Sequence, residues 1–244
     1  MSEPISDTAT RERAQRGAQA VPSGVPTGRV VGVLLLCAGT LALAGNLLHP
    51  RYSGADVAIY RQIAGSSMFV VADLLLLPAL VLGTIGLAGL ARRGSGSFGD
   101  VARVTAIVGG ALAIAQTGVE LQALRQQART FAAAASLDRV GAFWSTNSLD
   151  RLNGALTASW IVLLLGVTPL LLALIQLTAR TAPGGVALVG GAGGVICAGV
   201  GVINLLSQDQ GHADVTFLVG SLLTTTWILT TGYLLASKPE LSRG

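Results

Sequence analysis

Six long apolar segments constrain this chain more than any other feature of its sequence. They lie near residues 30–49, 67–91, 102–124, 156–178, 185–206 and 215–236. A helix of about 20 residues is long enough to cross a hydrocarbon layer roughly 30 Å thick. Hydrophobic residues make up 51% of the chain and charged residues 11%, and the charges are concentrated between the apolar segments. We therefore predict an integral membrane protein.

The segments are expected to be helices, because an unpaired backbone amide in lipid costs several kcal/mol and the segments lack the alternation of barrel strands. The fold class is thus all-α, a polytopic bundle of six transmembrane helices with short interfacial helices on the external side. ADVAIYRQIAGSS in the first loop is predicted to be such a helix. The third span is expected to continue to about Ala135 and the fourth to begin near Ser148, whose hydroxyl can cap it. Phe143 and Trp144 between them are typical of an interfacial anchor.

The distribution of Lys and Arg predicts the orientation. One side carries ten, namely Arg11, Arg13, Arg16, Arg29, Arg92, Arg93, Arg103, Arg180, Lys238 and Arg243. The other side carries six in longer loops, namely Arg51, Arg61, Arg125, Arg129, Arg139 and Arg151. We therefore expect both termini in the cytoplasm. The expected location of the protein is the inner membrane of a bacterial cell. The predicted organisation is a disordered cytoplasmic tail over 1–28, a six-helix domain over 29–237 and a cytoplasmic tail over 238–244.

Several classes of function lack support in the sequence. The net charge of +4 needs no nucleic-acid partner, because cytoplasmic arginines of a membrane protein account for it. Walker, GxSxG and HExxH motifs are absent, as is a Cys/His spacing typical of a metal site. The two histidines are both expected near the external surface, so a bis-His pair for two haems is excluded. We expect no enzyme activity, no cofactor and no metal site, and the pairing of Cys37 with Cys197 stays open.

A group of polar residues is predicted in the outer third of the bundle. Asp73 lies about five residues inside the second span, and an ionised carboxyl group should face protein or water rather than lipid. Gln116 and Glu120 are one helical turn apart on the third span. The candidate polar pocket consists of Asn46, His49, Asp73, Gln116, Glu120, Asn204, His212 and Asp214.

A short motif occurs twice along the chain. NLLHPRYSGADV at 46–57 and NLLSQDQGHADV at 204–215 share Asn-Leu-Leu and Ala-Asp-Val, separated by six residues in each copy. If each copy marks a helix that ends at the outer surface before an Asp that caps the next, the two flanking hairpins are related by duplication. The alternative is a chance match in a chain rich in Leu and Ala.

Glycine is concentrated in the fifth span, which reads GGVALVGGAGGVICAGVGV. Gly190 and Gly194 lie in GxxxG register, a spacing that lets helices approach closely. The expected partners are the lipid bilayer and a second copy or another membrane protein bound through helix 185–206.

The motif NLLHP at the end of the first span, followed by an acidic residue in the second, is similar to small six-span membrane proteins of actinobacteria. Those proteins have no known function, so the resemblance implies the six-helix fold and no activity.

Three interpretations of function follow. The favoured one is a non-enzymatic scaffold or assembly subunit, in which Asp73 and Glu120 are hydrogen-bonded to neighbouring helices. The alternative is a transporter-like or sensing module whose outward pocket binds a proton, a cation or a small polar ligand. A membrane enzyme or haem protein is the third. The first two differ in whether Asp73 reaches water.

Overall fold

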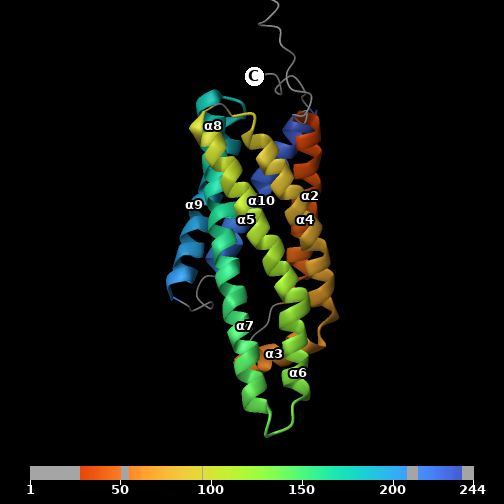
Figure 1. The fold of residues 1–244 in the computed structure, drawn as a ribbon. Helices are drawn as coiled ribbons and strands as arrows, with labels where there is room; N and C mark the ends of the chain where they lie inside the picture. The colour runs from red at the N-terminus through yellow and green to blue at the C-terminus, as the bar shows by residue number, and fades with distance from the viewer. Residues whose placement is uncertain (1–27, 51–54, 95, 208–213, 238–244) are drawn as a thin grey trace, which may run out of the picture.

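The chain folds into an elongated bundle of helices, shown by a computed structural model that describes residues 28–50, 55–94, 96–207 and 214–237 (Figure 1). The helices are α2 (Gly28–Leu48), α3 (Asp56–Gly65), α4 (Ser67–Ala91), α5 (Ser97–Gly118), η1 (Val119–Leu124), α6 (Arg125–Ala133), α7 (Arg139–Trp160), η2 (Ile161–Val167), α8 (Thr168–Ala179), α9 (Gly184–Ser207) and α10 (Asp214–Ser237). The described residues contain no strand. The all-α prediction is therefore confirmed.

Six of the helical segments are long and apolar enough to span a membrane. Two of them are composite: α5, η1 and α6 run on over Ser97–Ala133, and α7, η2 and α8 over Arg139–Ala179. These have 37 and 41 residues. At about 1.5 Å per residue they are about 56 and 62 Å long, nearly twice the hydrocarbon thickness. The chain is a multi-pass membrane protein, and its two longest helices exceed the length that is needed to cross the hydrocarbon layer.

The external loop differs in part from its prediction. The extension of the third span to about Ala135 is confirmed, since α6 ends at Ala133. The fourth span begins at Arg139 rather than at Ser148, so Ser148, Phe143 and Trp144 lie inside helix α7. The prediction that Ser148 caps a helix is wrong, because the backbone of α7 continues through that position and leaves no free helix terminus to cap.

The six spans form a closed ring in which each helix packs on two neighbours. Helix α2 contacts α4 and α10, α10 contacts α9, α9 contacts η2 and α8, and α5 closes the ring between α8 and α4. Close approaches depend on glycine: a Cβ on Gly194 would lie 2.7 Å from the Gly166 carbonyl oxygen. The glycines of α9 are thus used for packing inside the chain. Binding of a second protein through this helix stays a prediction.

Both composite helices contain a π-helical segment. In the second, η2 precedes Pro169, which lacks an amide hydrogen and cannot complete a helical hydrogen bond. The Thr168 hydroxyl donates to the Leu163 carbonyl at 2.8 Å, as expected for a proline that frees carbonyl groups. A second hydroxyl, that of Thr105 in α5, lies 2.8 Å from the hydroxyl of Thr168 and links the two helices.

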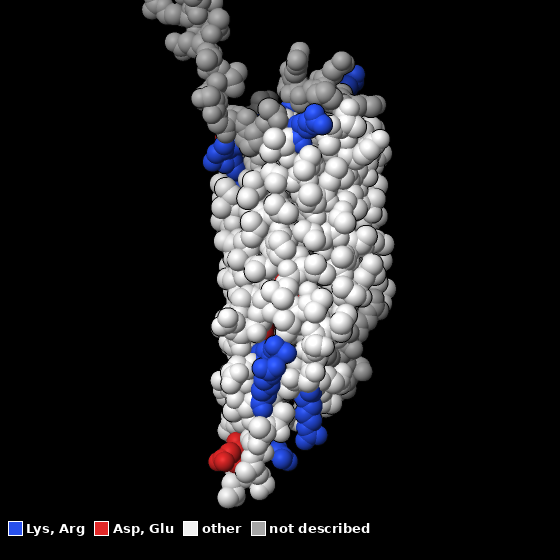
Figure 2. Space-filling view, turned by 90° about the vertical axis from the view of Figure 1, so that its right-hand side faces the viewer, with Lys and Arg blue, Asp and Glu red and all other residues white. Residues whose placement is uncertain are grey.

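The two ends of the bundle differ. At one end, here named the hairpin end, α3, α6 and the first half of α7 pack together, at the bottom of Figure 1. Their core is an aromatic and aliphatic cluster composed of Tyr60, Ile63, Phe69, Leu124, Ala128 and Phe131. Helix α2 begins and α10 ends at the opposite end. The face seen in Figure 2 has its Lys and Arg side chains at the top and in the lower third, and the band between them is white apart from small patches of Asp or Glu.

Other predictions are limited by the described residues. The tails, over most of 1–28 and over 238–244, and His212 lie outside them. The first copy of the repeated motif connects α2 to α3 and the second connects α9 to α10, with Asp56 and Asp214 as first helical residues. The helix after the first copy is thus the short α3, and duplication stays a prediction. Cys37 is exposed, Cys197 is buried, and they form no disulfide.

Candidate functional site

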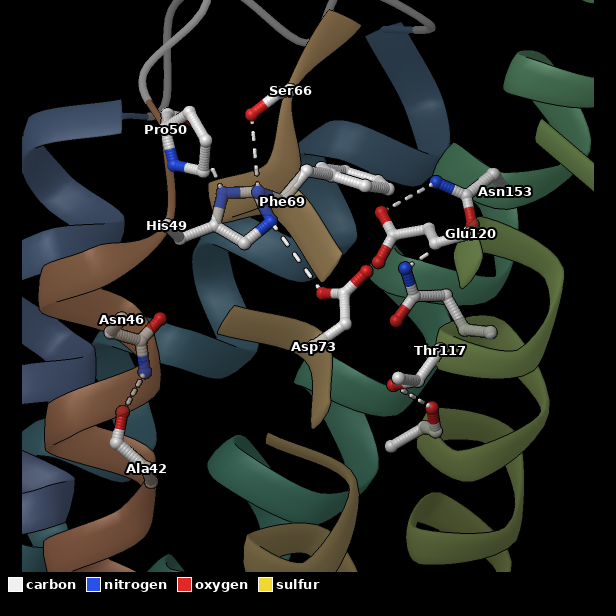
Figure 3. A network of polar contacts seen from close by, with 12 residues as sticks. Ala42, Asn46, His49, Pro50, Ser66, Phe69, Asp73, Thr117, Glu120 and Asn153 are labelled. Carbon is white, nitrogen blue, oxygen red and sulfur yellow. Dashed lines mark hydrogen bonds and ion pairs between the residues drawn. The ribbon is translucent and has the colours of Figure 1, made fainter. Parts of the chain in front are cut away.

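Three acidic or imidazole side chains from three separate helical segments converge near the hairpin end. His49 directly follows α2, Asp73 lies in the second turn of α4, and Glu120 belongs to η1 (Figure 3). One ligand atom from each, the ring nitrogen or a carboxylate oxygen, lies within 4.8 Å of the others. Figure 3 shows the two carboxylates pointing toward one another, with the imidazole beside Asp73. We name these residues the acidic triad.

Asp73 is the most enclosed member of the triad. Its side chain is 1% exposed, and neither carboxylate oxygen has a hydrogen-bond donor among the described residues. The nearest nitrogen is in the ring of His49, whose Nε2 lies 3.7 Å from Asp73 Oδ1. A buried carboxylate without donors loses hydration that nothing in the surrounding protein replaces. The prediction that protein encloses Asp73 beside His49 and Glu120 is confirmed.

The orientation of His49 is fixed from two sides. Its Nδ1 lies 3.2 Å from the carbonyl oxygen of Pro50, which can accept a hydrogen bond but cannot donate one. When the ring donates through Nδ1 to this oxygen, its other nitrogen, Nε2, is the one that faces Asp73 Oδ1. The Phe69 ring packs edge-on against the imidazole with centroids 5.6 Å apart. Phe69 is held in turn at the start of α4, where the Ser66 hydroxyl accepts its backbone amide hydrogen.

Glu120 is held by a chain of amide side chains. Asn153 of α7 donates through Nδ2 to Glu120 Oε1 at 2.9 Å, and its Oδ1 accepts from Gln116 Nε2 at 3.2 Å. Both amides are buried. Glu120 lies in the π-helical segment η1, and such segments are frequent at functional sites because they change the direction of side chains. Unlike Asp73, Glu120 therefore has defined donors.

Two cavities meet at the triad. The larger, of about 710 Å³, lies under α3, and its polar lining residues are His49, Glu120, Asp150, Arg151, Asn153, Thr157 and Asn204. The smaller, of about 310 Å³, extends into the bundle toward Leu87 and Leu164 and is mostly apolar. His49, Glu120, Thr157 and Phe217 line both. Asp73 lines neither and lies behind His49 and Glu120. Volumes of this size are typical of small-ligand sites.

A second polar network attaches α3 to α7 on the hairpin side of the larger cavity. The Tyr60 hydroxyl donates to Asp150 Oδ2 at 3.2 Å and accepts from Asn147 Nδ2 at 3.2 Å. Burial raises the pKa of Tyr60 to about 12, and the Asn147 hydrogen bond opposes that rise. The neighbouring charges of Asp150 and Asp56 raise this pKa further. The phenol thus stays neutral and holds α3 in place.

The structure brings together part of the predicted polar pocket. His49, Asp73 and Glu120 form the triad, with Gln116 linked to it through Asn153. Asn204 lines the larger cavity, and its buried Oδ1 has no donor among the described residues. Asn46 lines the smaller cavity, but its amide donates to Ala42 of its own helix at 2.8 Å. His212 lies outside the described residues, and the side chain of Asp214 does too.

Three residues at these cavities were missed from the sequence. Tyr60 lies in the predicted interfacial helix, and Asp150 and Asn153 lie in the predicted early part of the fourth span, outside the membrane core. A signal was present, because Asp150 and Asn153 are three residues apart and share a helical face. Placing Asn153 opposite Glu120 required the register of α7 against η1, which no local pattern supplies.

Comparisons with known proteins identify no family. No protein-family model, curated protein or solved structure significantly matches the chain. Conclusions about function therefore depend on the residues of the site and on their geometry.

Proposed function

We propose that this membrane protein binds a cation at the acidic triad and acts as a non-enzymatic transporter-like or sensing module. The supporting observation is Asp73, whose two buried carboxylate oxygens have no hydrogen-bond donor in the described part of the chain. Desolvating a carboxylate costs several kcal/mol unless a counter-charge or donors compensate. A bound cation supplies that counter-charge.

The surroundings of the triad support a cation over an anion. Two carboxylates face each other, and no Lys or Arg forms an ion pair with either one among the residues described. His49 is 32% exposed and lines both cavities, as Glu120 does, so a solute in either cavity contacts two members of the triad. An anion would meet like charge at this position.

We propose further that the protein lies in a bacterial cytoplasmic membrane with both termini in the cytoplasm. The excess of Lys and Arg on the terminal side supports this orientation. The hairpin end then faces outward, and the larger cavity is an outward-facing pocket.

A scaffold or assembly subunit is the second candidate function. It is favoured by the position of Asp73, which lies behind the cavity wall instead of on it. The hydrogen bond that Asn153 donates to Glu120 also favours the scaffold, because such a contact between helices is expected of a carboxylate with a purely structural role. This candidate offers no reason for the missing donors of Asp73.

Cation binding is tested by thermal unfolding of the purified protein in detergent and metal-free buffer. Na⁺, K⁺, Mg²⁺, Zn²⁺ and an alkylammonium salt are titrated separately. We expect at least one to raise the unfolding temperature, because a ligand at 100 times its Kd stabilises by about 2.7 kcal/mol. The Asp73→Asn variant should lose the effect, whereas the same change at exposed Asp100, at the far end of α5, should keep it.

The scaffold interpretation makes the opposite prediction. If no cation stabilises the parent protein more than it stabilises Asp73→Asn, the cation-binding function is wrong. Size-exclusion chromatography of both variants, with the same elution volume as the parent, ensures that folded proteins are compared.

A further inference from the structure

We infer that the ligand of the acidic triad is a divalent transition-metal ion, bound by His49 Nε2 and by one carboxylate oxygen each from Asp73 and Glu120. This inference rests on the proposed function and specifies the cation. Nitrogen from imidazole and oxygen from carboxylates are the ligands that Zn²⁺, Mn²⁺ and Fe²⁺ use in proteins.

The spacing of the three atoms suits a small metal ion. Metal–ligand bonds of about 2.0–2.2 Å at a tetrahedral angle separate ligand atoms by about 3.4 Å. His49 Nε2 and Asp73 Oδ1 are already 3.7 Å apart, and all three atoms lie within 4.8 Å of one another. Closing the widest remaining gap takes at most about 1.4 Å, a movement that side-chain rotation alone provides.

Two of the three proposed ligands, His49 and Glu120, have hydrogen-bond partners of the kind that orient ligands in metal sites. A metal-binding histidine usually donates its other ring nitrogen to a carbonyl or carboxylate, and His49 Nδ1 contacts the Pro50 carbonyl at 3.2 Å. Ligating carboxylates are likewise hydrogen-bonded, and Glu120 accepts from Asn153 at 2.9 Å. Asp73 has no such partner, so both its oxygens are available to a metal ion.

Charge balance favours a divalent ion. Two carboxylates and a neutral imidazole carry a charge of minus two, which one divalent cation cancels in a region where uncompensated charge is costly. Three protein ligands leave at least one coordination position open, and His49 and Glu120 border the larger cavity, from which water or a further ligand can reach it. The cavity also supplies the route by which the ion enters.

Selectivity among metal ions tests the role of His49. Isothermal titration calorimetry of Zn²⁺, Mn²⁺ and Mg²⁺ is carried out on protein purified without a histidine tag. We expect one Zn²⁺ per chain, bound more tightly than Mg²⁺ by at least about 10-fold, because an imidazole ligand favours transition metals. His49→Gln should weaken Zn²⁺ binding by about 10- to 100-fold and leave Mg²⁺ binding within a few-fold of the parent.

The carboxylates are tested separately. Asp73→Asn and the isosteric Glu120→Gln should each weaken Zn²⁺ binding by at least about 10-fold, while Asp100→Asn leaves it unchanged. Two isosteric variants are used so that a folding defect in one does not decide the result. Equal affinities for Zn²⁺ and Mg²⁺, or unchanged Zn²⁺ binding in His49→Gln, would overturn the inference.

The outcome for other cations separates this inference from the proposed function. If Na⁺ or an alkylammonium ion stabilises the protein in an Asp73-dependent way and no transition metal binds, the metal inference is wrong and cation binding stands. If no cation binds in an Asp73-dependent way, both are wrong. Asp73-dependent binding of Zn²⁺ or Mn²⁺ supports both.

Discussion

The Nε2 atom of His49 lies 3.7 Å from Oδ1 of Asp73, although one residue directly follows α2 and the other lies within α4. This distance is too long for a hydrogen bond and short enough for an ion pair or a shared metal ion. Asp73 is thus buried beside an imidazole, and its carboxyl oxygens have no hydrogen-bond donor among the described residues.

Replacing Asp73 should stabilise the protein when no cation is present. In chelator-treated buffer, we expect Asp73→Asn to raise the free energy of unfolding by about 1–3 kcal/mol, because a buried carboxylate without donors is removed. Chemical denaturation followed by tryptophan fluorescence measures the change. Exposed Asp100→Asn should change it by less than about 0.5 kcal/mol. A loss of stability in Asp73→Asn would mean that the carboxylate has a structural partner.

The orientation of the bundle can be tested by cysteine labelling. Leu137 at the tip between α6 and α7 is 94% exposed, and Ser97 begins α5 at the opposite end. In a protein with Cys37→Ser and Cys197→Ala, we expect Leu137→Cys to react with a membrane-impermeant maleimide in intact cells. Ser97→Cys should react only after the membrane is opened. The reverse pattern would place the hairpin end in the cytoplasm.

Gly194 should tolerate no side chain. A Cβ there would lie 2.7 Å from the Gly166 carbonyl oxygen and 2.9 Å from the Leu170 amide nitrogen, and backbone atoms cannot rotate away. We expect Gly194→Ala to destabilise the protein by about 1–3 kcal/mol.

Gly199 of the same helix is the matched control, because nothing lies within 4 Å of a Cβ at that position. Gly199→Ala should be neutral or slightly stabilising, since alanine favours helix more than glycine does. Thermal unfolding of the two variants in detergent makes the comparison. Equal unfolding temperatures would contradict the packing of α9 against η2.

Tyr60 should make stability depend on alkaline pH. Its pKa rises from 10.0 to about 12 on folding, chiefly through burial. The neutral phenol therefore contributes stability that is present below pH 10 and is lost as pH rises toward 12, because only the unfolded chain ionises in that window. In Tyr60→Phe, we expect lower stability than in the parent at pH 8 and a difference that shrinks by pH 11.

The control for this titration is Tyr233, which is 62% exposed. Thermal unfolding of Tyr233→Phe should show the same pH dependence as the parent protein between pH 8 and pH 11. A parallel decline of Tyr60→Phe and the parent would show that the buried phenol does not titrate as expected.

Asn153 should matter for cation affinity without touching the cation. It donates to Glu120 at 2.9 Å, so Asn153→Ala leaves that carboxylate free to rotate. We expect Zn²⁺ affinity to fall by about 10- to 100-fold in calorimetric titration. Asn147→Ala removes a similar amide from the Tyr60 network, at 3.2 Å from the phenol oxygen, and should leave the affinity unchanged. Equal losses in both variants would indicate a general loosening of α7.

The sequence by itself determined the six spans and the burial of Asp73. Apolar length is a local property, since about 20 apolar residues suffice to cross the bilayer whatever surrounds them. The cost of a charge in lipid likewise predicted that Asp73 is enclosed by protein. The start of α7 at Arg139 could not be predicted in this way, because the first half of that helix packs against α3 and α6, which are distant in space from the membrane-spanning pattern that the sequence shows.

Only the tertiary structure decided which polar residues meet. Asn46 lies in the last turn of α2 and His49 directly follows it, yet His49 joins the triad while the Asn46 amide donates to the Ala42 carbonyl of its own helix. Asn153 reaches Glu120 because α7 packs beside η1, and the π-helical turn of η1 sets the direction of that carboxylate. Such contacts depend on the register between helices distant in sequence. Interhelical packing fixes this register through close approaches such as that of Gly194 to Gly166, and no single helix carries that information in its own sequence.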